Sequence, residues 1–490
     1  MTRHRTSAFV IGACTIAMTA GAVLGLSARQ AEFSPDMLLR AIAPAFFTAA
    51  DSDGDGAVTR QELRASLEQL RRRAGGTDTV SITSAQLGSA INTAILGQLM
   101  APPGPQNETP TPASLRAMMA ALPARAPATP ARPRKVLVLG KAAGFVHSSI
   151  PLAAKTVEAL GTRTGAWTTT ITYSPADITT ANLQQYDAIF LASTTGCFLD
   201  EPGDPAATNA RRAALLAFVR GGKGLAAIHA ATDSYHSPCP NDAAAPAPAP
   251  AAAGRSGGGG GAFGLDALLA GPITKQADAN HDDRISAAEM AAVADHWFDV
   301  IDTPRTGRVD KVAFSMKFAA ALGVPPSPAP STAAARGTGP QPVGTWPDFN
   351  QLIGGFFKFH WLYPQEITVK IDDPSSPLTA MFHGREFVIH DETYTFAQDS
   401  FSRKHVHVLT SIDYAKMSAA DKAQEPAATA RTDGDYALSY IRREGRGRVF
   451  YEAHGHDEAI YAMTPMLEHL LAGIQYAIGD LKTDDSPSAK

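Results

Sequence analysis

The sequence predicts an α/β fold: a parallel sheet whose chain is interrupted by a helical insertion. The runs Lys135–Leu139 and Ala188–Ala192 are almost continuously apolar, as in strands buried on both faces. Helical stretches alternate with these strands, which favours a parallel sheet. The alternation stops at the Pro-, Ala- and Gly-rich segment Pro238–Ala262. Because strand patterns resume near Glu366, we expect one α/β domain built from both sides of the insertion.

The elements of this domain follow in order. Before the insertion we expect strands at 135–139, 168–173, 188–192 and 224–229, with helices at 150–160 and 206–220. Pro205 suits the start of the second helix. After the insertion we expect strands at 366–371, 406–409, 437–442 and 448–451, and a closing helix at 463–477.

Composition excludes several classes of protein. The 490 residues are 44% hydrophobic, which is enough for one or two cores and too apolar for a wholly disordered chain. Only 18% are charged, and the net charge of -4 argues against a nucleic-acid partner, which would need a concentrated basic face. Three cysteines are too few for a disulfide scaffold.

The N-terminus has the pattern of a secretory signal peptide. Arg3 and Arg5 precede an apolar run from Ala8 to Leu26, and small residues follow. We therefore expect export to the periplasm or the extracellular space, with no membrane span after cleavage. The alternative is an uncleaved anchor through residues 8–28. Export leaves Cys197 and Cys239, which either pair in an oxidising compartment or stay buried thiols.

Residues 51–62 match a calcium-binding EF-hand loop. A hard cation needs about six to eight oxygen ligands, and carboxylates at positions 1, 3 and 5 with a glutamate at position 12 supply most of them. Gly56 at position 6 permits the sharp turn. The predicted Ca²⁺ ligands are Asp51, Asp53, Asp55, the carbonyl of Ala57, Thr59 and Glu62.

A second loop of the same kind lies in the insertion. It has Asp283 at position 6, where glycine is usual, and aspartate tolerates left-handed backbone better than most residues. We expect Ca²⁺ to bind here more weakly than at the first loop. The predicted ligands are Asp278, Asn280, Asp282, the carbonyl of Arg284, Ser286 and Glu289.

Each of these loops is followed by a degenerate one. The segment from Asp302 keeps a turn glycine but has Ala313 at position 12, and the segment near Ile82 lacks the acidic ligands. Val58 and Ile82 are separated by 24 residues, as are Ile285 and Val309. The equal spacing predicts two copies of one pair, each a good loop beside a packing partner. Because one loop of each pair lacks the ligands to bind the ion, we expect calcium to have a structural role rather than a sensing role.

These patterns give the expected domain organisation. We predict a signal peptide at 1–30, an EF-hand pair at 31–100, a Pro/Ala-rich linker at 101–133, the first part of the α/β domain at 134–237, a linker-flanked EF-hand insertion at 238–345, the second part of the α/β domain at 346–482, and a tail at 483–490.

Several motifs of the α/β domain resemble those of a known family. They are Gly144–Ile150, Tyr186–Phe190, Thr194–Gly196, Phe218–Asp233, Asp391–Tyr394 and Gly447–His456. In their order along the chain and in their residue patterns, these motifs resemble those of the trehalose-utilisation (ThuA-like) family. The resemblance covers about 134–235 and 346–481. That family is similar to the class I glutamine amidotransferases. The resemblance therefore implies a flavodoxin-like parallel sheet, with its site at the carboxyl ends of the strands, where open α/β sheets form their crevice.

The resemblance also implies what the site does not do. In amidotransferases a cysteine nucleophile stands in the sharp turn after the strand that corresponds to Leu225–Ile228, and here His229 occupies that place. Cys197 follows a different strand. Glutamine hydrolysis through a thiolate is therefore not expected.

Polar side chains remain as candidates at this edge of the sheet. They could transfer protons, ligate a transition metal, or hydrogen-bond sugar hydroxyls beside aromatics such as Tyr394 and Trp361. Each histidine could also be a structural residue. The candidate catalytic residues are His147, His229, Asp233, Glu392, Tyr394 and His456, with Asp391 beside them.

Two functions from different classes fit these observations. The first is an exported hydrolase or lyase that acts on a small-molecule or carbohydrate ligand, with calcium modules as stabilisers. The second is a non-catalytic, calcium-stabilised protein that binds carbohydrates or cell-surface partners. The first requires the histidines to converge in the fold. The substrate, the reaction, the protein partners and whether the chain is an enzyme stay open at this point.

Overall fold

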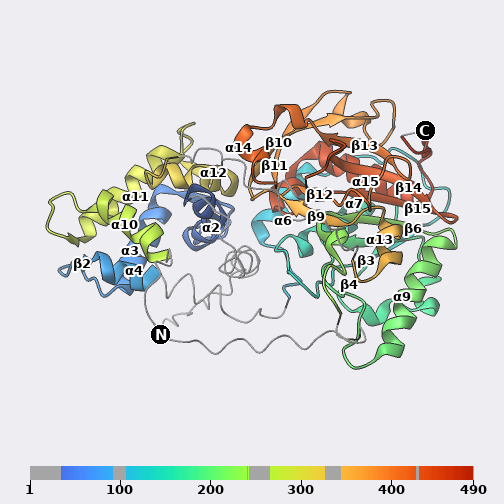
Figure 1. Cartoon of the computed structure of the whole chain (residues 1–490), viewed down its shortest axis with the longest axis horizontal. Coiled ribbons are helices and arrows are strands. Elements are labelled where there is room, and N and C mark those ends of the chain that lie inside the picture. The colour runs from blue at the N-terminus through green and yellow to red at the C-terminus, as the bar shows by residue number, and fades with distance from the viewer. Residues whose placement is uncertain are drawn as a thin grey trace. The chain divides into compact units, whose positions relative to one another are not determined.

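The computed structural model describes residues 35–91, 106–239, 241, 265–325, 344–425 and 430–488, so the predicted signal peptide lies outside the described residues. These residues divide into two compact units (Figure 1). One unit combines the N-terminal segment with the insertion, and the other is the α/β domain. Among the helices of the described residues, none combines the length and the hydropathy that a membrane span requires.

The helical unit draws its elements from both segments. Its helices are α2 (Pro35–Ala50), α3 (Arg60–Arg73), α4 (Ser84–Ile91), α10 (Leu265–Ala277), α11 (Ala287–Ile301) and α12 (Lys311–Ala321). Its short strands are β1 (Ala57–Thr59), β2 (Ile82–Thr83), β7 (Arg284–Ile285) and β8 (Arg308–Asp310). Because α2 packs against α12, α3 against α11 and α4 against α10, the two segments share one hydrophobic core.

The loops pair across the two segments, which corrects the expected pairing within each segment. Val58 lies opposite Val309 in the β1–β8 pair, and Ile82 lies opposite Ile285 in the β2–β7 pair. Each complete calcium loop thus pairs with the degenerate loop of the other segment.

The length of the helix between the two strands of each segment explains this pairing. Helix α3 separates β1 from β2 and has 14 residues, so it is about 21 Å long. Helix α11 has 15 residues and separates β7 from β8 in the same way. Two strands at opposite ends of one straight helix cannot pair with each other. Each must find its partner in the other segment.

In the α/β unit, nine strands of the described residues form one sheet in the order β11-β10-β13-β14-β15-β6-β5-β3-β4. The strands β4, β3, β5, β6 and β15 are parallel, in the 2-1-3-4-5 order of flavodoxin-like folds, and the other four extend the sheet antiparallel. The bounds are β3 (Lys135–Leu139), β4 (Thr168–Thr172), β5 (Ala188–Ala192), β6 (Gly224–Ile228), β10 (Gln365–Ile371), β11 (Phe387–Asp391), β13 (His407–Ile412), β14 (Ala437–Glu444) and β15 (Gly447–Glu452).

Helices cover this sheet in two groups: α7 packs with α15, and α9 packs with α8 and α13. A small antiparallel pair, β9 (Phe357–His360) and β12 (Tyr394–Phe396), forms a separate two-stranded sheet. The helices are α6 (Pro112–Ala121), α7 (Ile150–Thr164), α8 (Thr180–Leu183), α9 (Pro205–Arg220), α13 (Pro347–Ile353), α14 (Ala419–Lys422) and α15 (Thr464–Ile478). Short 3₁₀ helices are η3 (Pro175–Asp177), η4 (His229–Asp233), η5 (Ala380–Phe382), η6 (Tyr414–Lys416) and η7 (Glu458–Ala462).

The described part of the Pro/Ala-rich segment, which the sequence predicted to be a linker, is packed against the α/β unit. Helix α6 contacts α7 and η7, and Met118 is buried in the core of the α/β unit. The Gln106 side chain accepts a hydrogen bond from the backbone N–H of Ala142 (3.0 Å). The apolar face of one short helix is therefore enough to bind this segment to the sheet domain.

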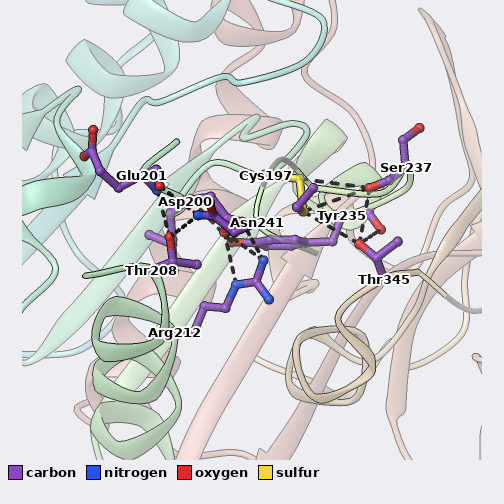
Figure 2. The surroundings of a disulfide bond; sticks show 11 residues. Cys197, Asp200, Glu201, Thr208, Arg212, Tyr235, Ser237, Asn241 and Thr345 are labelled. Atoms are coloured by element: carbon purple, nitrogen blue, oxygen red, sulfur yellow. Dashed lines mark hydrogen bonds and ion pairs between the residues drawn. A yellow bond between two sulfur atoms is a disulfide. The ribbon is translucent and has the colours of Figure 1, made fainter. Parts of the chain in front are cut away.

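The insertion leaves and rejoins the α/β unit at one place (Figure 2). Cys197, after β5, forms a disulfide with Cys239, next to the start of the excursion, with 5.8 Å between their Cα atoms. Where the chain returns, the backbone N–H of Thr345 donates to the carbonyl of Tyr235 (2.8 Å). The disulfide, rather than two free thiols, is thus the state of Cys197 and Cys239, and it anchors the base of the insertion.

Candidate functional site

The first calcium loop brings its acidic side chains together. Carboxylate oxygens of Asp51, Asp53 and Asp55 lie within 4.8 Å of one another. Asp51 accepts the backbone N–H of Asp55 through Oδ1 and of Gly56 through Oδ2, each at 3.0 Å. Burial raises the pKa of Asp51 against these hydrogen bonds, and the nearby carboxylates of Asp55 and Glu62 raise it further. Carboxylates this close together repel one another, and a divalent cation between them would offset that repulsion.

Glu62 closes the same loop, and its hydrogen bonds join both ends of it. Its Oε1 accepts the backbone N–H of Ser52 (3.1 Å), and its Oε2 accepts the backbone N–H of Thr59 (2.9 Å). Thr59 caps α3 in return, completing a capping box. Ala57 lies in β1. Hydrogen bonds within the loop therefore hold the predicted ligands Asp51 and Glu62, and the full ligand set for Ca²⁺ stays a prediction.

The second loop has the same internal geometry. Asp278 accepts the backbone N–H groups of Asp282 and Asp283, and Asn280 accepts that of Asp282, each at 3.0 Å. Ser286 and Glu289 form the matching capping box at the start of α11, and Arg284 lies in β7. Asp283 has φ 59°, so aspartate adopts the left-handed turn that glycine adopts in the first loop. Calcium binding at this second loop stays a prediction.

In the α/β unit, four side chains far apart in the sequence converge. His147, His229, Glu392 and His456 are all buried, and one ligand-type atom of each lies within 4.8 Å of the others. His147 follows β3, His229 follows β6, and His456 follows β15, so three carboxyl ends of parallel strands contribute. Glu392 comes from the turn between β11 and β12. This group is called the histidine cluster below.

His229 sits in a sharp turn that aims its ring into the cluster. It has φ 48°, a left-handed conformation that costs energy for any residue with a side chain, and it follows β6 directly. Its Nδ1 lies 2.9 Å from the carbonyl oxygen of Ala453. Because a carbonyl only accepts, Nδ1 carries a proton, and Nε2 on the other side of the ring lies 3.2 Å from Nε2 of His147.

Glu392 is held from two sides. Its Oε2 lies 3.1 Å from Nδ1 of His456 and 3.4 Å from Nε2 of His229, and its Oε1 lies 3.1 Å from Nδ1 of His360. Burial alone would raise the pKa of Glu392, but His360 and His456 hold it well below its usual range. Burial lowers the pKa of His147, and the neighbouring His229 and His456 lower it further. The cluster thus combines an ionised carboxylate with a neutral imidazole.

Asp391 positions the His456 loop rather than joining the cluster. Its carboxylate accepts three successive backbone N–H groups, from Gly455 (2.6 Å), His456 (3.2 Å) and Asp457 (2.9 Å). Gly455 has φ 127°, and a side chain there would meet Tyr461 and Ile228, so only glycine fits this turn. The loop is therefore fixed by backbone hydrogen bonds before any ligand arrives.

The remaining candidates lie around the cluster. The ring of Tyr394 packs on that of His229, with 4.3 Å between centroids. Asp233 pairs with His236, whose Nδ1 lies 3.0 Å from Oδ1. Trp361, expected as a sugar-stacking aromatic, is fully buried, and its Nε1 donates to the carbonyl of Asp421 (2.9 Å), so it packs in the core.

Sequence reasoning missed His360, which holds the second oxygen of Glu392. His360 ends β9, and Glu392 lies between β11 and β12, two residues before the start of β12, which pairs with β9. The sequence did not predict either strand, and so gave no signal that the two residues meet.

A second buried ionic group lies next to this region. Glu452, His454 and His469 are each almost fully buried; Nδ1 of His454 lies 2.6 Å from Glu452 Oε1, and Nε2 of His469 lies 3.2 Å from Oε2. Burial alone would raise the pKa of Glu452, but His454 and His469 lower it to about 2. This group links β15 to α15 and so serves the core.

Comparisons with known proteins fit this geometry. The family model of ThuA, described as trehalose utilisation, matches residues 135–247 and 336–477, which is more than half of the chain. The chain belongs to the ThuA family. A model of the EF hand matches residues 43–67, which contain the first calcium loop. The protein is therefore a ThuA-like protein that carries a calcium-binding EF-hand motif. A search of the curated proteins finds no match.

Two solved structures were compared with the chain. One is described as a ThuA-like protein from Bacteroides uniformis, with 14% identity, a TM-score of 0.40, and coverage of 73% of this chain and 98% of that one. The other is described as a ThuA-like protein from Parabacteroides merdae, with 13% identity, a TM-score of 0.34, and coverage of 73% and 96%. The family assignment rests on the family model.

Proposed function

We propose that this ThuA-like protein is an exported enzyme that acts on a carbohydrate or sugar derivative through the histidine cluster. The observation that carries the proposal is the convergence of His147, His229, His456 and Glu392 at the carboxyl ends of parallel strands. Open α/β sheets bind ligands at this edge. The family's association with trehalose utilisation supports a sugar as the ligand.

The cluster has the chemical parts that such a reaction needs. Hydrolysis and elimination of a glycoside both require one proton to leave and another to be delivered. Glu392 offers a carboxylate and His456, 3.1 Å away, offers an imidazole, and groups of these two kinds can accept or deliver protons. Nδ1 of His147 is buried and makes no hydrogen bond to any described residue, so a polar ligand or water is its expected partner.

Export is supported by the disulfide. Cys197 and Cys239 are bonded, and structural disulfides form and persist in oxidising compartments rather than in the cytosol. N-terminal sequencing of the mature protein tests export: a start near residue 29 or 32 supports it, and an intact Met1 on a cytosolic protein contradicts it.

A substrate panel tests the catalytic part. Trehalose, other glycosides and keto-sugars are incubated with the wild type and with His229→Ala and Glu392→Gln. We expect turnover of at least one sugar, and a loss of about 10²-fold or more in each variant because general acid–base groups contribute that much. His296→Gln removes an exposed imidazole from the helical unit and is the matched control. Sugar binding without turnover in the wild type would instead favour the non-catalytic binding protein.

A further inference from the structure

We propose that the histidine cluster binds one divalent transition-metal ion of the zinc class, through His147, His229, His456 and Glu392. This site is separate from the calcium loops in ligand type. Calcium prefers oxygen ligands, as in the EF-hand loops, whereas three imidazoles and one carboxylate suit zinc and its neighbours.

The separations between the ligand atoms fit a tetrahedral shell. With bonds of about 2.0–2.1 Å, neighbouring ligand atoms in such a shell lie about 3.3–3.4 Å apart. Nε2 of His229 lies 3.2 Å from Nε2 of His147 and 3.4 Å from Oε2 of Glu392. Oε2 of Glu392 lies 3.1 Å from Nδ1 of His456. The side chains therefore need little movement to enclose a single ion.

The atoms that face the centre are electron-pair donors. In the neutral ring of His229, Nε2 has the lone pair, because Nδ1 keeps its proton and donates it in a hydrogen bond to the carbonyl of Ala453. Glu392 turns Oε2 inward while His360 occupies Oε1. A carboxylate oxygen and imidazole nitrogens thus face one another at 3.1–3.4 Å in a buried space. One cation satisfies all of them together.

The surroundings also match those of metal ligands. A ligating histidine usually donates its second nitrogen to a carbonyl or carboxylate, which fixes its tautomer, and the His229–Ala453 contact does this. His360 plays the corresponding part for Glu392, and Asp391 holds the backbone of His456. Supports of this kind hold ligands in place before the ion binds.

Metal analysis of the untagged, full-length protein tests this inference. The protein is saturated with calcium, dialysed against Zn²⁺, and its zinc content is measured. We expect about one zinc per chain, removable by 1,10-phenanthroline, which prefers transition metals to calcium. His229→Ala and Glu392→Gln should lower the affinity for zinc by about 100-fold or more, since loss of supporting groups alone costs 10–100-fold. His296→Gln should bind as the wild type does.

A second measurement does not depend on the variants' folding. Co²⁺ added to the wild type should give the intense visible absorption of a four-coordinate site with nitrogen ligands, and Zn²⁺ should abolish it. Folded wild type that takes up no stoichiometric zinc or cobalt overturns the inference, as does zinc content unchanged in both variants. The outcome is separable from the proposed function: zinc binding without sugar turnover refutes only the proposed function, and sugar turnover by a protein that takes up no stoichiometric zinc or cobalt refutes only the metal site.

Discussion

The two calcium loops and the histidine cluster are built in opposite ways. Each calcium loop takes its side chains from twelve consecutive residues, of which five are exposed in the first loop and seven in the second. The histidine cluster takes four buried side chains from residues up to 309 positions apart and from four separate connections of the sheet domain. The loops are therefore readable as sequence motifs, whereas the cluster exists only after the sheet has formed.

This difference has a consequence for stability. The first calcium loop brings three carboxylates together between α2 and α3, and a bound cation would offset their repulsion. The histidine cluster is supported by backbone hydrogen bonds, a strained turn and the packed core of the sheet. We expect metal removal to weaken the helical unit strongly and the α/β unit little.

The crossed pairing of the loops gives the largest expected effect. Val58→Cys with Val309→Cys should form a disulfide under mild oxidation, because the two residues are opposite each other in β1–β8. Val58→Cys with Ile82→Cys should not, because α3 separates them. Mass spectrometry after thiol blocking distinguishes the two. Cross-linking of the Val58–Ile82 pair instead would mean that each segment pairs with itself.

Breaking the second buried ionic group should cost about 3–5 kcal/mol of unfolding free energy, since Glu452→Gln leaves two buried imidazoles without their carboxylate. Chemical denaturation measures this. Glu386→Gln, which breaks an exposed pair with Lys416, is the control and should leave the midpoint unchanged. Equal effects of the two changes would show that burial does not set the cost.

Loss of the native disulfide should destabilise the α/β unit by about 2–4 kcal/mol, because Cys197 and Cys239 close a loop of 42 residues. Cys197→Ser with Cys239→Ser, compared with the wild type in the presence and absence of a reductant, measures this. The reductant should lower the melting temperature of the wild type and leave that of the variant unchanged. If the variant and the oxidised wild type melt together, the disulfide does not brace the base of the insertion.

The smallest effect concerns the backbone of the second calcium loop. Asp283→Gly should tighten calcium binding there by a few fold, because glycine adopts φ 59° at no steric cost, a gain of about 1 kcal/mol or less. Gly56→Ala is the matched opposite change at position 6 of the first loop: Gly56 has φ 85°, so backbone strain should weaken binding. Calcium titration by calorimetry checks both. If neither substitution changes the affinity for calcium, backbone strain in the loop does not set the strength of binding.

Much of the sheet domain could be predicted from the sequence, because its central strands are continuous apolar runs. The expected strands at 135–139 and 188–192 have the bounds of β3 and β5, and the helix expected at 206–220 begins one residue earlier, at Pro205. The strands β9, β11 and β12 were missed because each is short and only partly apolar, or mixed with charge, so periodicity gives no clear signal.

The site could be predicted only in part, for a physical reason. Position after a strand places His229 and His456 at one edge of the sheet, but nothing local tells which loop from another strand reaches them. Glu392 and His360 meet through the β9–β12 pair. The crossed calcium loops were within reach of the sequence, since 24 residues between Val58 and Ile82 leave room for one helix and no reversal of the chain.

Scanning calorimetry as calcium is added to calcium-free protein, with zinc held constant, tests most directly the claim that the two regions are stabilised differently. Millimolar Ca²⁺ should raise the melting temperature of the helical unit, because binding at a hundredfold excess over Kd stabilises it by about 2.7 kcal/mol per site. The melting temperature of the α/β unit should stay unchanged. Two transitions that move together, or neither moving, would contradict the account.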